Sequence, residues 1–282
     1  MRIRIHHATH YRFDRPVPYG LQRLRLMPKA THEQRVISWD MTVEGGYREA
    51  EYDDQHLNHV VLVKVAEGAT EVVIRCDGVV ETQTGRHGIV GSHQGPAPLW
   101  LFQRHTPRTL PGPAITSIVD EIRDRSADDD IDRLHALSAS IADRVSYVVG
   151  ATDATTSGEE AAVAGKGVCQ DHAHIMLAAA RELGHPARYV SGYLASSDDG
   201  VRHEASHAWA EVAIDHVGWI GFDVSNGISP DERYVRVATG RDYVDAAPLT
   251  AVSYGARDTE MHVSVEVERV TVRDGEGPEE TS

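Results

Sequence analysis

The sequence predicts an α+β fold, in which an antiparallel β-sandwich or barrel domain precedes a core of helices and strands. The first hundred residues alternate apolar and polar side chains in short runs separated by polar turns, which is typical of strands in a small sandwich or barrel. Residues 115–145 and 168–183 instead repeat apolar side chains at a spacing of three and four, as amphipathic helices do. Alternation returns over residues 187–223, so strands follow the last helix.

Composition is that of an ordinary folded protein. The chain has 282 residues, of which 41% are hydrophobic and 25% charged, enough for one large domain or two ordinary ones. The net charge of −15 argues against nucleic acid as a partner, because such binding needs a basic surface. No apolar run has the length of a signal peptide or a membrane span, so we expect a cytoplasmic protein without membrane contact.

Alternation marks the predicted strands of the N-terminal domain, residues 1–95, at positions 3–13, 21–26, 37–43, 60–65 and 71–80. Cys76 lies in the last of these strands, without a helix start or a clustered base beside it. We therefore interpret Cys76 as a structural thiol. Two cysteines make no disulfide framework.

Glycines and prolines cluster around residues 96–112 and predict a surface linker, anchored by Trp100, Leu101 and Phe102. Two short amphipathic helices follow, over residues 115–122 and 134–145. The acidic run Asp128–Asp130 lacks the glycine and the later glutamate of a calcium-binding loop. It is better placed to cap the start of the second helix, where negative charge is favoured.

Cys169 lies in the first turn of the next predicted helix, which begins near Val168 and stops at Gly184. The predicted buried face of this helix is formed by Ala173, Met176, Leu177 and Ala180. A thiol at a helix start meets unpaired N–H groups and the positive end of the helix dipole, which favour the nucleophilic thiolate. The alternative is that Cys169 is a small buried apolar residue, as most cysteines are.

A base and an orienting group are predicted on the hairpin that follows. If Ile214 pairs with Gly218, then His207 and Asp223 become diagonal neighbours on one face. Trp209 and Glu211 share that face. A slip of one residue would place His207 and Asp223 on opposite faces.

These residues form a candidate triad. Cys169 would attack a carbonyl carbon, His207 would exchange the proton, and Asp223 would fix the imidazole tautomer. The backbone N–H of Cys169 is a natural donor to the oxyanion. This chemistry needs no cofactor and no metal.

A zinc hydrolase is a further alternative, because His203 and His207 flank one loop end and could bind zinc with Cys169. No spaced metal-binding motif supports it. His172 and His174 are two apart on a helix and point to different sides.

Three motifs, Gly167-Val-Cys-Gln-Asp, Ala205-Ser-His-Ala-Trp and Gly221-Phe-Asp, resemble those of the transglutaminase-like superfamily, relatives of the papain-like cysteine proteases. The resemblance is closest to a bacterial branch with an N-terminal β domain, which here is matched by Thr9-His-Tyr-Arg-Phe-Asp and Gln22-Arg-Leu-Arg-Leu-Met-Pro. It implies a catalytic core over residues 113–270, in which a nucleophile helix packs on an antiparallel sheet. It also implies acyl transfer at an amide of a peptide or protein through a thioester, by Cys169, His207 and Asp223. The activity would be that of a protease, an amidase or a cross-linking enzyme.

The sequence departs from the family pattern at several places. His172 replaces a usual aromatic residue, and Asp223-Val-Ser-Asn-Gly replaces Asp-Pro-Thr-Asn-Gly. The sequence does not identify a second hydrogen-bond donor to the oxyanion. Tyr147 is a candidate, but packing in the core is its favoured role. A catalytically inactive peptide-binding module is the alternative function, against which the intact triad speaks. The acidic tail, residues 271–282, is expected to be disordered.

Overall fold

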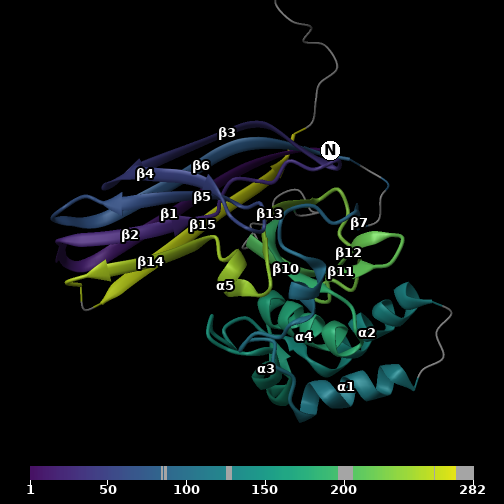
Figure 1. The fold of residues 1–282 in the computed structure, drawn as a ribbon. Helices are drawn as coiled ribbons and strands as arrows, with labels where there is room; N and C mark the ends of the chain where they lie inside the picture. Colours follow the sequence, from purple (N-terminus) through teal and green to yellow (C-terminus); the bar gives the residue numbers. More distant parts are fainter. Residues whose placement is uncertain (84, 86–87, 125–128, 196–205, 257, 271–282) are drawn as a thin grey trace, which may run out of the picture.

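Eight strands of the computed structural model form a sandwich of two antiparallel sheets (Figure 1). The structure describes residues 1–83, 85, 88–124, 129–195, 206–256 and 258–270. One sheet has the order β15 (Thr259–Arg269), β1 (Arg2–Val17), β6 (Ala69–Thr82), β3 (Gln34–Glu44). The other has the order β14 (Leu249–Tyr254), β2 (Tyr19–Leu24), β5 (His59–Val65), β4 (Gly46–Asp53). The predicted N-terminal β domain is thus confirmed.

Cys76 lies inside this sandwich, among buried valines and leucines. Its side chain is fully buried, and burial raises the pKa of the Cys76 thiol to about 12. The thiol is therefore protonated and inaccessible at neutral pH, in agreement with a structural role.

The sandwich is completed by strands from the far end of the chain. In β14, Leu249 pairs with Leu24, and in β15 Arg269 pairs with Ile3. The residues of β14 and β15, which the sequence analysis assigned to the 113–270 core, therefore belong to the sheets of the N-terminal domain. Apolar alternation in these strands indicates their conformation but not the distant strands that they pair with.

The second domain is built on a five-stranded antiparallel sheet with helices against it (Figure 1). Its strand order is β13 (Tyr234–Gly240), β10 (Ala187–Leu194), β11 (Ser206–Ile214), β12 (Gly218–Phe222), β7 (Ile89–Gly91). The helices are α1 (Pro113–Arg123), α2 (Asp130–Arg144), α3 (Gly158–Ala164), α4 (Cys169–Glu182) and α5 (Tyr243–Ala246). Two short parallel strands, β8 (Ser146–Tyr147) and β9 (Lys166–Gly167), precede α4. This arrangement confirms the predicted α+β class.

The predicted surface linker has secondary structure and a buried side chain. It contains a 3-10 helix, Leu99–Gln103, whose Phe102 packs against Trp219. Just before the linker, β7 joins the core sheet, although its residues were assigned to the N-terminal domain. Trp100 is more than half exposed, so Phe102 is the main anchor. The next helices follow the prediction, and Asp129 caps α2 by accepting a hydrogen bond from the Asp132 N–H at 2.9 Å.

Helix α4 is the central helix of the core. The prediction of one buried face was too narrow, because residues 171–181 are buried all round. Helices α1, α2 and α3 cover the side turned away from β10 and β11, which explains the difference. No helix in the described part of the chain is long and apolar enough to span a membrane.

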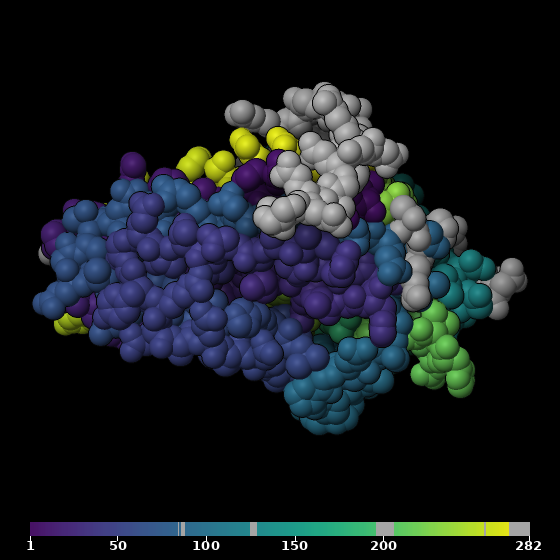
Figure 2. All heavy atoms as spheres, turned by 90° about the horizontal axis from the view of Figure 1, so that it is seen from above, coloured from purple at the N-terminus to yellow at the C-terminus, as the bar shows by residue number. Residues whose placement is uncertain are grey.

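The sandwich also covers the open edge of the core sheet. Gln34 hydrogen-bonds both the N–H and the C=O of Arg236, and Asn58 does the same with Thr239. These side-chain amides take the place of a neighbouring strand along β13. Seen from above, the sandwich forms most of the visible face, and the core emerges at one end (Figure 2).

Candidate active site

The start of α4 is built by the Gly-Val-Cys-Gln-Asp motif. The Asp171 carboxylate accepts hydrogen bonds from the Val168 N–H at 2.8 Å and the Thr152 hydroxyl at 2.6 Å. A Cβ on Gly167 would lie 2.7 Å from the Asp171 Cβ, so only glycine fits there. Burial raises the pKa of Asp171. These contacts fix the first turn and hold Cys169, which is partly exposed, at its beginning.

The hairpin of β11 and β12 has the register that the sequence analysis assumed. Ile214 pairs with Gly218, and Ala210 pairs with Phe222. Gly218 has a φ of +95° and lies close to the Gly91 carbonyl of β7, where no side chain fits. This register brings His207 and Asp223 together.

His207 lies between Cys169 and Asp223. Its Nε2 is 2.6 Å from Asp223 Oδ2, and the Cys169 side chain lies near enough to the ring to act on its pKa as a hydrogen-bond partner. Since Nε2 is occupied by Asp223, the nitrogen available to the thiol is Nδ1. Burial alone would lower the pKa of His207, but the hydrogen bonds and charges of Asp223 and Cys169 raise it to about 10. The imidazolium is therefore the favoured form at neutral pH.

Asp223 is held by two residues that sequence reasoning missed in this role. Its Oδ2 accepts hydrogen bonds from the Tyr234 hydroxyl and from Asn226 Nδ2, each at 2.6 Å. Burial alone would raise the pKa of Asp223, but the contacts with His207, Tyr234 and Asn226 lower it. Asn226 lies in the quoted Asp-Val-Ser-Asn-Gly stretch, which was the available signal. Nothing in the sequence indicated Tyr234, because β13 reaches the site by strand pairing.

Two departures from the family pattern meet in one contact. His172 Nδ1 accepts a hydrogen bond from the Ser225 hydroxyl at 2.8 Å, and its Nε2 donates to the Val145 carbonyl at 2.9 Å. Burial lowers the pKa of His172, so the ring is neutral in this structural position. Tyr147 lies beside it, with 6.1 Å between ring centroids. The expectation that Tyr147 packs in the core was wrong, because about half of its side chain is exposed.

The other histidines of the region show no shared metal site. His174 Nε2 accepts a hydrogen bond from the Tyr243 N–H at 3.2 Å, and burial lowers the pKa of His174 to about 3. Within the residues that the structure describes, no three His, Cys, Asp or Glu side chains are grouped to hold a metal ion. His203 of the zinc alternative lies outside these residues.

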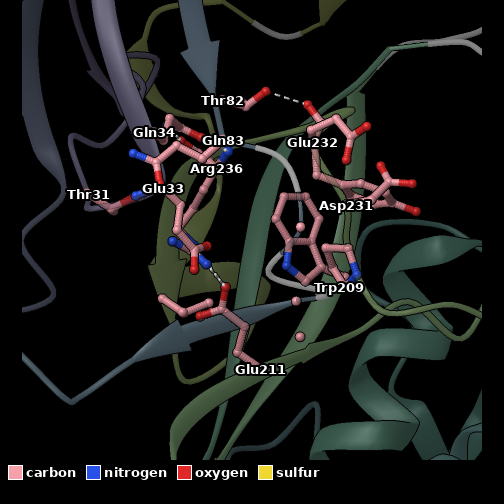
Figure 3. A pocket seen from close by; sticks show the side chains of 16 residues that line it. Thr31, Glu33, Gln34, Thr82, Gln83, Trp209, Glu211, Asp231, Glu232 and Arg236 are labelled. Atoms are coloured by element: carbon pink, nitrogen blue, oxygen red, sulfur yellow. Dashed lines mark hydrogen bonds and ion pairs between the residues drawn. The ribbon is translucent and has the colours of Figure 1, made fainter. Parts of the chain in front are cut away.

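Two cavities lie on the face of the core sheet that carries His207. The Trp209 cavity, of about 280 Å³, is lined by Trp209, Glu211, Tyr234 and Arg236 of the core and by Gln34 of the sandwich (Figure 3). The second, which we name the Lys29 cavity, is about 520 Å³. Neither is lined by Cys169 or His207.

Trp209 connects the Trp209 cavity to the triad. It stacks on the His207 ring at an interplanar angle of 29° and meets Tyr234 edge-on at 85°. Gly192 leaves room for it, since a Cβ there would lie 2.8 Å from the indole. The Trp209 Nε1 is buried and has no hydrogen-bond partner among the described residues. The Trp209 indole thus packs against one face of the His207 imidazole.

Glu211 forms buried ion pairs with two arginines and does not contribute to the triad. Its carboxylate is fully buried and forms ion pairs with Arg188 and Arg236. Burial alone would raise the pKa of Glu211, but the two guanidinium groups lower it. Figure 3 shows the Arg236 contact. Glu211 is therefore not free to orient His207.

Comparison with known proteins relates the sequence of this chain to a wider group. Residues 116–224 match the transglutaminase-like superfamily, and residues 3–81 match the bacterial transglutaminase-like N-terminal region. An uncharacterized protein of Mycobacterium leprae is 30% identical over 279 residues, which cover 95% of this chain and 99% of that protein. An uncharacterized protein of Mycobacterium tuberculosis is 30% identical over 94% of this chain and 92% of its own length.

A solved structure shares the fold. A candidate cysteine protease from Cytophaga hutchinsonii superimposes with a TM-score of 0.75 at 21% identity, covering 97% of this chain and 92% of that one. The similarity therefore includes both domains.

Proposed function

Because the chain belongs to the transglutaminase-like superfamily, we propose that it is an enzyme that cleaves an amide or peptide bond through a thioester on Cys169. One observation carries the proposal: Cys169, His207 and Asp223 form a continuous chain of contacts at the start of a buried helix. The thioester also allows transfer to an amine, so cross-linking is a second outcome of the same chemistry. Hydrolysis by a protease or amidase is the main proposal.

Acylation would begin with the thiolate–imidazolium pair. The Cys169 sulfur attacks the carbonyl carbon, and the new oxyanion accepts a hydrogen bond from the Cys169 N–H, which has no partner within the helix. The His207 imidazolium then donates its Nδ1 proton to the leaving nitrogen, and the C–N bond breaks. Asp223 keeps the ring oriented throughout. The products are a free amine and a thioester.

Deacylation reverses these roles. Neutral His207 takes a proton from water, and the hydroxyl oxygen attacks the thioester carbon. The C–S bond breaks, the acid leaves and the thiolate–imidazolium pair is restored. A primary amine in place of water would give a transferred amide instead.

The substrate class stays a prediction from the sequence. We propose a peptide or protein substrate, without nucleic acid or membrane, and the cytoplasm as the compartment. Cell fractionation followed by detection of the protein tests the compartment directly.

The decisive experiment traps the acyl-enzyme. The protein is mixed with a set of peptide p-nitroanilides, quenched in acid and analysed by mass spectrometry. We expect an acyl mass on Cys169 that disappears in Cys169→Ser and persists in Cys76→Ala, the matched control. Adding a primary amine then measures the partition between hydrolysis and transfer.

An inactive peptide-binding module predicts a different result. In that case peptides bind, no adduct forms, and Cys169→Ser binds as the wild type does. Absence of any adduct across substrates and thiol-reactive acyl donors would refute the enzymatic proposal.

A further inference from the structure

The Lys29 cavity lies between the two domains. It is lined from the sandwich side by residues 29–32, 56 and 57 and from the core side by Arg188, Arg236 and Thr239. Val90 of β7 and the following Ser92 and Gln94 complete the lining. Its volume of about 520 Å³ is large enough for a small molecule. None of the described residues that line it is an aspartate or a glutamate.

Three cationic side chains face this space. Lys29, between β2 and β3, is held in place because its Nζ donates to the carbonyls of His56 at 2.8 Å and Leu57 at 2.7 Å. Arg188 extends from β10 and Arg236 from β13, and both lie in walls of the cavity. All three are largely shielded from bulk water. Both domains therefore contribute cations to the lining of one cavity.

Among the residues that the structure describes, two carboxylates lie near these cations: Glu211, and Glu33, which shares the wall of the neighbouring Trp209 cavity with Glu211 and Arg236. Glu211 takes one ion pair with each arginine, and Arg188 also lies over the Trp219 ring, 4.1 Å from its centroid. The next carboxylates are matched elsewhere. Asp54 pairs with Arg25 at 3.1 Å, and Asp245 pairs with Arg241 at 2.8 Å.

Asp245 also meets His56, at 3.4 Å. Within the described residues, positive charge thus exceeds negative charge at this cavity.

The excess of positive charge affects the pKa of Lys29. Burial, followed by repulsion from Arg188 and Arg236, lowers the pKa of Lys29 to about 7, and the attraction of Asp54 and Glu211 does not offset it. A further negative group beside Lys29 would raise this pKa and favour the charged amine at neutral pH. A buried cluster in which cations outnumber carboxylates is suited to bind an anion, because the anion supplies the missing counter-charge.

We propose that the Lys29 cavity binds a small oxyanion, a carboxylate or a phosphate, held between the two domains by Lys29, Arg188 and Arg236. Thr31, Ser92 and Gln94 supply neutral hydrogen-bonding groups around it. Because the ligand contacts both domains, binding stabilises their contact as well as the fold. The site is separate from the triad, and the proposal does not depend on the activity of Cys169.

The test is calorimetric titration with inorganic phosphate and, separately, with succinate, at constant ionic strength set with sodium chloride. We expect one saturable site for at least one of the two anions, and the tighter one identifies the preferred group. Lys29→Gln should weaken that binding at least tenfold. Lys64→Gln, a change of a sandwich lysine outside the cavity, is the matched control and should leave it unchanged.

Proton uptake provides a second measurement on the wild type. Succinate carries both charges at pH 8, so it should raise the pKa of Lys29 and draw in a proton, measured by comparing buffers of different ionisation enthalpy. Other titratable and charged groups surround Lys29: His32, His56, Arg188 and Arg236 line the same cavity, and Asp54 and Glu211 act on Lys29 from outside its lining. Lys29→Gln therefore assigns the proton.

Several results would overturn the proposal. One is the absence of saturable binding for both anions. Another is equal binding by Lys29→Gln and the wild type. If Lys29→Gln does not fold, the wild type alone decides the matter. Saturable binding of succinate to the wild type without proton uptake at pH 8 would then refute the proposed site.

Discussion

Replacing His207 with alanine should shift the alkylation of Cys169 to higher pH. In the proposed mechanism, the His207 imidazolium donates a hydrogen bond to the Cys169 sulfur and favours the thiolate, which is the form that reacts with iodoacetamide. Alanine removes this partner and leaves the helix start unchanged. The rate at neutral pH should fall, while the limiting rate at high pH should not.

The expected size follows from the contact. A hydrogen bond to a charged group contributes about 1.5–3 kcal/mol. At about 1.4 kcal/mol for each tenfold change, the midpoint of the labelling curve should move up by about one to two pH units. The rise of the pKa of His207 from 6.5 to about 10 includes the larger contribution of Asp223, so it sets an upper bound.

The assay is iodoacetamide labelling of the native protein across pH, with each cysteine peptide quantified by mass spectrometry. Cys76 is an internal control, because it is fully buried and should label only after unfolding. Coincident curves for wild type and His207→Ala would refute the proposed pair. Faster labelling of Cys76 than of Cys169 would do the same.

Three further predictions follow from the site. Because the pKa of His207 is raised in the folded state, its contribution to stability is complete below pH 6.5 and is lost as the pH rises to about 10. The unfolding free energy of the wild type should therefore fall over that interval more than that of His207→Ala. Unfolding free energies from urea titrations that change in parallel for the two proteins would contradict this. Tyr234→Phe removes a donor 2.6 Å from Asp223 and should lower kcat/KM about 10- to 100-fold with little change in KM, so wild-type kinetics would exclude a positioning role. Gly167→Ala forces a Cβ against Asp171 and should cost about 1–3 kcal/mol of stability together with activity, and a denaturation midpoint equal to the wild type would show that the helix start tolerates the methyl group.

The sequence predicted the parts of the site that depend on local spacing. The helix start at Cys169 follows from glycine punctuation, and the contact of His207 with Asp223 follows from a short hairpin whose register is set by its turn. Tyr234 and Asn226 complete the site differently. Asn226 follows Asp223 by three residues, but the position of Tyr234 depends on β13 pairing with β10 through an irregular register, which no local pattern records.

The same distinction holds for the fold. Each strand of the sandwich shows its own apolar alternation, but the pairing of β14 and β15 with β2 and β1 spans more than two hundred residues. The Lys29 cavity was also invisible in the sequence. Its three cations lie far apart along the chain and are neighbours only because the sandwich covers the β13 edge.

The return of β14 and β15 to the first domain constrains the order of events during synthesis. When residues 1–95 leave the ribosome, β1 and β2 have no partner on one side, because the strands that pair with them are made only after the core. These backbones must wait, open to pairing with other chains, until the whole core has been translated. The sandwich therefore begins before the core in the sequence but is completed after it, and a nascent chain released between the two would leave β1 and β2 each without one partner strand.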